Sequence, residues 1–214
     1  MAEKPIEVSS SKTFGGYTKR YKHYSPVLIE LHYLSNTDED FFLNSGAQRV
    51  ASTEGVVLIA PDTSPRGLDI EGEEGGWDLG TGAGFFVNAT QEKWKNYRMY
   101  DYVVKELPKL LADNFDQLDT FRASVCGFAM GGHGALIIFL KNIDKLIVPT
   151  ILLDQGDADE YKDTALLPHT FEEACKKANV SLRLRLQPGY NHSYDFVATF
   201  IDDHIRHHAK VLSH

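Results

Sequence analysis

The stretch from residue 123 to residue 140 constrains the fold more than any other part of the chain. Residues 123–126 are short and apolar, as in a buried strand, and residues 131–140 are small residues followed by an apolar run typical of a helix. Between them, residues 127–131 read Gly-Phe-Ala-Met-Gly. This order predicts a buried strand that turns sharply into a helix, the repeating unit of α/β folds.

Strand-like and helix-like segments alternate along the rest of the chain. Strands are predicted at residues 27–34, 56–60, 124–127, 147–153 and 182–186, and helices at 39–54, 96–114, 131–142, 168–179 and 196–210. This alternation predicts a mainly parallel sheet of about five strands with helices on both faces. The 214 residues suit a single α/β domain over 1–214, with ligands bound at the carboxyl ends of the strands.

Several segments carry more specific local signals. Residues 63–88 are rich in glycine and are expected to form a long functional loop. Pro108 is expected to kink the helix predicted at 96–114 or to end it early, and Pro149 moves the expected start of the fourth strand to Thr150. Residues 182–186 alternate strictly between apolar and charged types, so the last strand is expected near a sheet edge.

Composition excludes some partners and indicates a compartment. The net charge of −8 argues against a nucleic-acid partner. No apolar run approaches the roughly 20 residues that span a bilayer, and the first residues lack the apolar core of a signal peptide. Cys126 and Cys175 lie in segments that read as a strand and a helix, which favours two reduced structural thiols. We therefore expect a cytoplasmic protein with no membrane partner.

The turn at residues 127–131 has the form of a nucleophile elbow, G-x-S-x-G, with alanine in place of the serine. In an α/β-hydrolase the nucleophile is followed along the chain by an acid and then by a histidine. The loop after the last predicted strand contains His192, which suits the histidine position. The elbow and this loop both follow strand ends, so Ala129 and His192 are expected to converge.

Three aspartates are candidates for the acid, because Asp154, Asp157 and Asp159 all follow or end the fourth predicted strand. Spacing alone does not choose among them, although Asp154 ends the strand and suits the cap of a turn. An acid in this place would fix the tautomer of the histidine and stabilise its protonated form.

The remaining histidines have simpler interpretations. His133 lies one turn past Ala129 and is expected to pack or to form a hydrogen bond within its helix. The spacing of His204, His207 and His208 could suit a metal, but no carboxylate or cysteine set completes such a site. We expect a solvated helix end there, where cationic side chains are favourable, and no metal.

Longer runs of the sequence resemble S-formylglutathione hydrolase, also called esterase D. They include Met-Gly-Gly-His-Gly-Ala-Leu at 130–136 and Gly-Tyr-Asn-His-Ser-Tyr at 189–194. Further matching runs lie at residues 45–49, 60–67, 82–85, 88–94, 98–108 and 200–208, so the resemblance covers nearly the whole chain.

The resemblance implies a serine thioesterase of the α/β-hydrolase fold. Such enzymes hydrolyse S-formylglutathione to glutathione and formate, the second step of glutathione-dependent formaldehyde removal, and they also cleave small carboxylic esters. It implies a serine nucleophile at position 129, Asp159 as the acid and His192 as the base. It implies a small-molecule thioester or ester substrate, no metal and no organic cofactor, and it is compatible with a homodimer.

The sequence departs from the family first at the elbow itself. Ala129 cannot attack a thioester carbonyl, and loss of a serine nucleophile costs on the order of 10⁶ in kcat. Phe128 stands where the family usually has histidine. We therefore expect a chain that is inactive as written. A substrate-trapping Ser-to-Ala variant and a non-catalytic protein that binds glutathione conjugates or a protein partner are the alternatives.

The second departure concerns the oxyanion hole. One backbone N–H is expected from Met130, directly after the elbow position. The other is expected from the loop at Ser35 and Asn36, where the family has a stretch like Ser-Gly-Leu-Thr-Cys-Thr. A missing donor costs roughly 10²–10³ in rate.

The third departure is length. The family has a further strand, a helix and an excursion over the active site between the elbow and the acid, and this chain runs from residue 145 directly into the next predicted strand. A second shortening follows residues 21–23, where the family has an N-terminal strand pair. Either the strand before Asp159 pairs directly with the elbow strand, or the chain is not stably folded.

Overall fold

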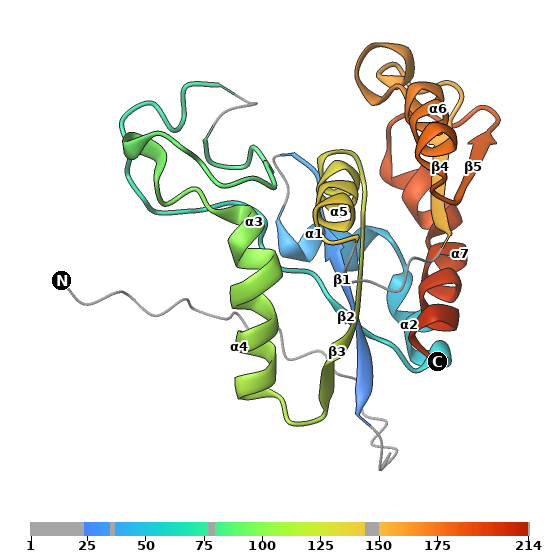
Figure 1. Cartoon of the computed structure of the whole chain (residues 1–214), viewed down its shortest axis with the longest axis horizontal. Coiled ribbons are helices and arrows are strands. Elements are labelled where there is room, and N and C mark those ends of the chain that lie inside the picture. Colours follow the sequence, from blue (N-terminus) through green and yellow to red (C-terminus); the bar gives the residue numbers. More distant parts are fainter. Residues whose placement is uncertain (1–23, 35–36, 77–79, 144–149, 214) are drawn as a thin grey trace.

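The structure is a computed structural model that describes residues 24–34, 37–76, 80–143 and 150–213 (Figure 1). Its strands are β1 (Ser25–Leu31), β2 (Val57–Ile59), β3 (Leu118–Gly127), β4 (Ile151–Gly156) and β5 (Leu182–Gln187). The α-helices are α1 (Asp38–Asn44), α2 (Ala47–Glu54), α3 (Met99–Asp101), α4 (Leu107–Asn114), α5 (Met130–Lys141), α6 (Pro168–Ala178) and α7 (Tyr194–Leu212). Shorter helical segments are η1 (Glu92–Trp94), η2 (Tyr102–Glu106) and η3 (Lys162–Leu166).

The five strands form two separate parallel sheets. One has the order β2-β1-β3, and the other pairs β4 with β5. The parallel α/β architecture predicted from the sequence is confirmed, and β5 lies at a sheet edge as expected. In the register of the first sheet, Leu31 is opposite Gly127, so the end of β1 lies beside the elbow.

Of the two alternatives stated above, the pairing of β4 with the elbow strand is wrong. Among the described residues no ladder joins β3 to β4, and both strands leave one edge unpaired. Figure 1 shows β4 and β5 beside α7, set apart from β1 and β3. β4 instead pairs with β5 and packs on α7, and β5 packs on α6.

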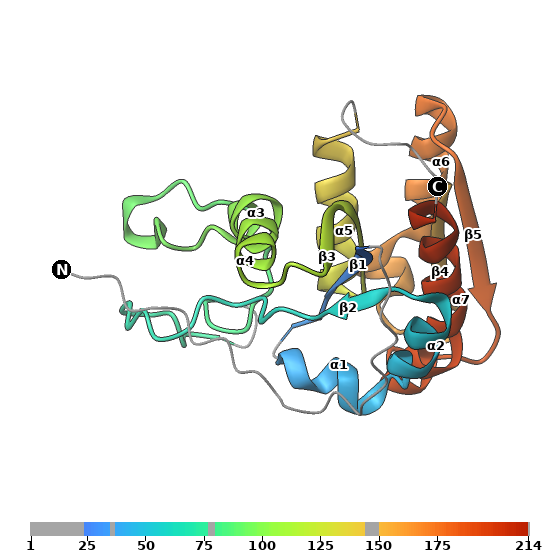
Figure 2. The same ribbon diagram turned by 90° about the horizontal axis from the view of Figure 1, so that it is seen from below.

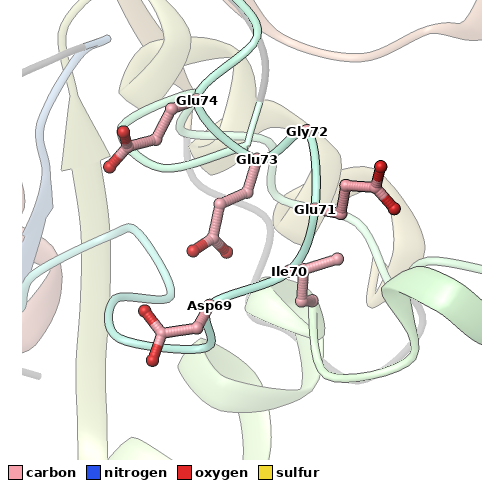
Figure 3. Close-up of a pocket in the computed structure, with 6 residues that line it drawn as sticks. All are labelled: Asp69, Ile70, Glu71, Gly72, Glu73 and Glu74. Atoms are coloured by element: carbon pink, nitrogen blue, oxygen red, sulfur yellow. The ribbon is translucent and has the colours of Figure 1, made fainter.

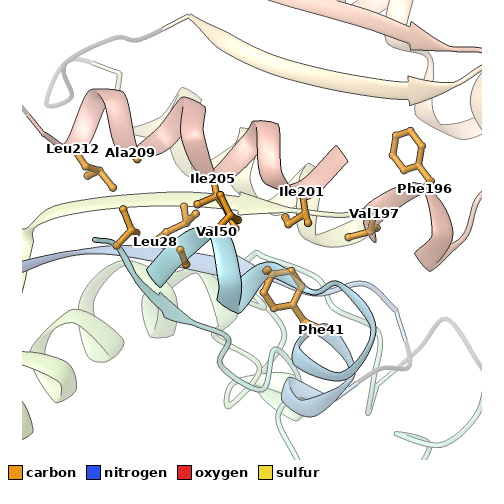
Figure 4. Close-up of a cluster of buried hydrophobic side chains, with 12 residues drawn as sticks. Leu28, Phe41, Val50, Phe196, Val197, Ile201, Ile205, Ala209 and Leu212 are labelled. Carbon is orange, nitrogen blue, oxygen red and sulfur yellow. The ribbon is translucent and has the colours of Figure 1, made fainter. Parts of the chain in front are cut away.

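Two apolar cores lie on opposite faces of the first sheet. On one face Leu28 packs with α2 and α7, and Phe41 and Ile205 are among the fully buried side chains (Figure 4). On the other face Val27, Ile29 and Leu31 pack with Phe86 and with residues of α3, η2 and α4. Each fully buried side chain of this size contributes roughly 1.5–3 kcal/mol of hydrophobic stabilisation.

The view in Figure 2 separates these layers: α2 and α7 lie on one side of β1 and α4 on the other. Alternation along β1 explains the arrangement, because successive side chains of a strand point to opposite faces. Helices therefore cover both faces of the first sheet, as the sequence predicts.

Local sequence signals explain where two predicted helices are interrupted. The helix expected at 39–54 is divided into α1 and α2 at Ser45 and Gly46, and Gly46 has a φ of +68° that favours glycine. The helix expected at 96–114 becomes α3, the π-helical η2 and then α4. Pro108 lies in the first turn of α4, where its missing N–H is tolerated, and the wider turns of η2 precede it.

Candidate active site

The elbow at position 129 is a strained turn between β3 and α5. Ala129 has φ 49° and ψ −116°, a conformation rarely adopted by a residue with a Cβ. Backbone hydrogen bonds hold the turn, from the N–H of Gly131 to the carbonyl of Phe128 at 2.8 Å and from His133 to Ala129 at 2.9 Å. A residue held in this way stores roughly 1–3 kcal/mol of strain.

Close backbone packing enforces this geometry. A Cβ added to Gly131 would lie 1.6 Å from the carbonyl oxygen of Leu31, and one added to Gly127 would lie 2.4 Å from the carbonyl carbon of Gly131. The two glycines of the motif thus let the first turn of α5 press against the end of β1. The methyl group of Ala129, on a half-buried residue, stands where a serine in this motif has its Cβ.

Asp159 and His192 lie next to each other, although they come from loops after different strands. Nδ1 of His192 is 2.8 Å from Oδ2 of Asp159. The carboxylate also accepts hydrogen bonds from the Tyr161 N–H at 2.8 Å and from the Gln155 side chain at 3.1 Å. If Nδ1 donates its proton to Asp159, Nε2 of His192 is left as the basic atom.

The other two acid candidates have different partners. Asp157 is exposed and accepts the N–H of Gly189 at 2.7 Å. Asp154 does not cap a turn, contrary to expectation: it lies inside β4, where Arg185 bonds both of its oxygens at 2.7 and 2.5 Å. Burial raises the pKa of Asp154, but hydrogen bonds from His204, Arg185 and Gln187 outweigh it and hold this pKa below the usual range.

Phe128 links the elbow to the imidazole. Its ring stacks on His192 with 4.6 Å between centroids and 29° between planes, and Tyr161 meets the same imidazole edge-on at 5.1 Å. Tyr33 contacts Phe128 at 5.3 Å and Tyr194 at 5.6 Å. The residue before Ala129 is therefore in contact with His192, so the elbow and the Asp159–His192 pair converge as expected.

One expected oxyanion donor, the N–H of Met130, directly follows the elbow position. Met130 begins α5, where the first N–H groups of a helix have no partner within it. A Cβ placed on Gly84 would lie 3.7 Å from Cβ of Met130 and 4.0 Å from the backbone nitrogen of Leu34. Ser35 and Asn36, the expected loop donors, lie outside the described residues.

The C-terminal histidines are not a solvated helix end, contrary to expectation. His204 Nε2 lies 2.8 Å from Oδ2 of Asp154, His207 Nε2 lies 2.8 Å from the carbonyl of Thr150, and His208 Nδ1 lies 2.7 Å from Oγ of Ser124. Within the described ranges, no group of three or more His, Cys, Asp and Glu side chains could hold a metal ion. His133 is exposed on α5.

Two polar side chains are buried at the end of β1, Glu30 within the strand and His32 just after it. Glu30 is 3% exposed, its Oε2 has no hydrogen-bond partner, and burial raises its pKa to about 8. His32 is 1% exposed with Nδ1 unpartnered, and burial lowers its pKa. Cys126 is opposite Glu30 in the ladder; burial and the Glu30 charge raise the pKa of its thiol, which suits an inert cysteine.

A shallow hollow lies in the glycine-rich loop, lined by residues 69–74 (Figure 3). Its lining includes four carboxylates, from Asp69, Glu71, Glu73 and Glu74. None of Ala129, Asp159 and His192 lines it. An anionic ligand would be repelled there, so this hollow is not part of the candidate site.

Comparisons with known proteins agree with the geometry. A family model described as a putative esterase matches residues 16–148. S-formylglutathione hydrolase of Arabidopsis thaliana is 48% identical over 282 positions, which cover 99% of each chain. The Bos taurus S-formylglutathione hydrolase is 43% identical and covers 97% of this chain and 98% of its own. These alignments are longer than the 214 residues here, so the relatives contain residues that this chain lacks.

The solved structure of an S-formylglutathione hydrolase from Agrobacterium tumefaciens superposes with a TM-score of 0.83 at 35% identity, over 89% of this chain and 86% of that one. No helix in the described part of this chain is long and apolar enough to cross a membrane. Fold, elbow, Asp159–His192 pair and sequence identity all lead to one assignment: the chain belongs to the S-formylglutathione hydrolase family of esterases.

Proposed function

We propose that this chain is a thioesterase and carboxylesterase by descent that has lost its nucleophile. The ancestral reaction is S-formylglutathione plus water to glutathione plus formate, as the names of the relatives suggest. The observation that carries the proposal is the Asp159–His192 hydrogen bond beside an elbow whose central residue is alanine. The acid and base positions are filled, whereas the atom that would attack is absent.

The roles follow from the positions of these groups. In a chain with serine at 129, Oγ would attack the formyl carbon while Nε2 of His192 took its proton. Asp159 would stabilise the imidazolium, and the N–H of Met130 together with one from the loop at Ser35 and Asn36 would stabilise the oxyanion. His192 would return the proton to the departing glutathione sulfur. A water molecule, activated by the same histidine, would then release formate and regenerate the serine.

With Ala129 this sequence cannot begin, because a methyl group offers no lone pair. Loss of the serine alone costs on the order of 10⁶ in kcat, or about 8 kcal/mol of barrier. A residual acceleration of roughly 10³–10⁴ over water can remain from binding and oxyanion stabilisation. We therefore expect no burst of acyl-enzyme and no turnover at triad-like rates.

The test compares the chain with its Ala129→Ser variant on S-formylglutathione and p-nitrophenyl acetate. The variant is expected to exceed the parent by at least about 10³ in kcat, and Ala129→Ser/His192→Gln is expected to lose that gain. Intact mass confirms each protein. Triad-like rates from the parent would refute the loss of function, and a variant as inactive as the parent would refute an otherwise preserved site.

A second candidate function is non-catalytic binding of glutathione conjugates or of a protein partner. The retained Asp159–His192 pair favours it, because the polar site has been kept without the nucleophile. Calorimetry with S-alkylglutathiones tests the small-molecule version, and an absence of heat at millimolar ligand would reject it. A substrate-trapping Ser-to-Ala variant remains the other alternative, and it predicts full restoration by Ala129→Ser.

We also infer a cytoplasmic protein whose site is built for a small-molecule thioester or ester and that has no nucleic-acid partner. The net charge of −8 supports the last point, because nucleic acids repel a protein with excess negative charge. A homodimer is compatible with this assignment. Light scattering after gel filtration measures the mass in solution, and fractionation of cells measures the compartment.

A further inference from the structure

The candidate site is assembled from both sheets. Ala129 follows β3 of the first sheet, whereas Asp159 follows β4 and His192 follows β5 of the second. Among the described residues no backbone ladder links the two sheets. The position of the Asp159–His192 pair relative to the elbow therefore depends on contacts other than strand pairing.

Helix α7 contacts both sheets. It packs on β1 and β3 of the first and on β4 of the second. Its apolar side, with Ile201, Ile205 and Ala209, joins the core that contains Leu28 (Figure 4). Ion pairs add to this attachment, since Arg49 of α2 bonds Asp202 at 3.0 Å. These contacts fix α7 to the first sheet.

Three histidines of α7 form hydrogen bonds with both sheets, one with β3 and two in or just before β4. His208 bonds Ser124 of β3, three residues before the elbow begins at Gly127. His204 bonds Asp154 inside β4, and His207 bonds the carbonyl of Thr150 just before β4. The i, i+3 and i+4 spacing puts the three side chains on one helical stripe, so a single helix can hold both strand edges.

We infer that His204, His207 and His208 form a seam that positions the Asp159–His192 pair against the elbow. They act as positioning residues through α7 and contact no reacting atom. The seam replaces strand pairing between β3 and β4. Its role in placing a hydrolase site rests on the proposed function and would concern a chain with serine at 129, whereas its structural effect can be measured on the chain as it stands.

The Phe128–His192 stack reports directly on the position of the two sheets relative to each other. Phe128 belongs to the elbow of the first sheet and His192 to the loop after β5, and their centroids are 4.6 Å apart. The aromatic ring current of Phe128 shifts the ring-proton NMR signals of His192. Phe128→Leu removes that shift and so identifies it. A change in the relative position of the two sheets would shift the same His192 signals.

The experiment compares two triple variants of the full chain. His204→Leu/His207→Leu/His208→Leu removes every hydrogen bond of the seam at similar side-chain volume. In the matched control, His204→Gln and His207→Gln each restore a nitrogen near Nε2, and His208→Asn restores one near Nδ1. NMR measures the His192 shift, and hydrogen exchange measures amide protection in β4 and β5 against β1 and β2.

The leucine variant is expected to lose the His192 shift, and the control is expected to keep it. Three hydrogen bonds, each worth roughly fivefold in an opening equilibrium, predict roughly a hundredfold faster exchange in β4 and β5. Exchange in β1 and β2 should change little. Retention of the shift and of the protection in the leucine variant would overturn the seam. Equal loss in the leucine variant and the control would overturn it as well.

If the leucine triple variant does not fold, single substitutions decide. His204→Leu is compared with His204→Gln, and His208→Leu with His208→Asn. Faster β4 exchange in each leucine variant than in its partner supports the seam, and equal exchange within both pairs overturns it. None of these measurements needs turnover, so failure of the seam and failure of the proposed hydrolase ancestry give separate results.

Discussion

Replacing Ala129 by glycine should stabilise the chain, although glycine usually destabilises a structured position. Ala129 has φ 49° and ψ −116°, which is strained for a residue with a Cβ. Release of that strain is worth roughly 1–3 kcal/mol. The greater backbone entropy of glycine in the unfolded chain removes roughly 0.5–1 kcal/mol of this gain. The net expectation is a stabilisation of about 1 kcal/mol.

Urea unfolding followed by circular dichroism measures this change. A rise of about 1 kcal/mol corresponds to an increase of roughly 2–4 °C in Tm for a domain of this size. Ala112→Gly is the matched control, because Ala112 is exposed inside the regular helix α4. There the same substitution should destabilise by about 1 kcal/mol.

The two variants should therefore shift stability in opposite directions. Destabilisation by Ala129→Gly as large as that by Ala112→Gly would refute the reasoning, because it would mean that position 129 carries no strain. An unchanged slope against urea in both variants is needed for the comparison, since it shows that the same amount of surface is exposed on unfolding.

Three further predictions concern stability. Burial raises the pKa of Glu30 from 4.5 to about 8, so the free energy of unfolding should fall as pH rises from about 5 to 8. Urea titrations at several pH values should show a flatter dependence of stability on pH for Glu30→Gln. The pKa of His208 is lowered by burial from 6.5 to about 3, so its contribution should fall as pH drops below 6.5, and His208→Asn should reduce that loss. Gly131→Ala would put a Cβ 1.6 Å from the carbonyl oxygen of Leu31 and should lower stability by more than about 4 kcal/mol, measured by thermal unfolding. Gly189→Ala, with no atom within 4 Å of the added Cβ, should lower it by only about 1 kcal/mol.

Local sequence signals predicted most of the helices and strands. The apolar run before the elbow and the small residues after it gave the β3–α5 unit, and strict alternation at 182–186 gave an edge strand. Breaks within helices were harder to predict. The helix expected at 39–54 contains Ser45 and Gly46, a pair that favours turns, and the positive φ of Gly46 shows that the helix divides there.

Contacts between distant residues could not be derived from spacing. Asp154, Asp157 and Asp159 all follow or end the same predicted strand, and they differ in their distant partners. Arg185 lies 31 positions from Asp154, and His192 lies 33 positions from Asp159. The C-terminal histidines looked solvated because Asp154, Thr150 and Ser124 are remote in sequence. The division into two sheets depends on which strands pair, and predicting where strands lie along the chain does not predict their pairing.

The strain at Ala129 bears on the proposed loss of function. A protein that no longer needs a nucleophile gains nothing from holding residue 129 at positive φ, and glycine there would relax it. Yet the conformation is enforced by neighbours that also build the core: Gly131 lies against Leu31, and Phe128 packs against the same core as Phe196. The elbow therefore persists as a packing requirement of β1, β3 and α5. Under the proposed function, alanine at position 129 is a chemical change within an intact turn, and Ala129→Ser tests that change without rebuilding the turn.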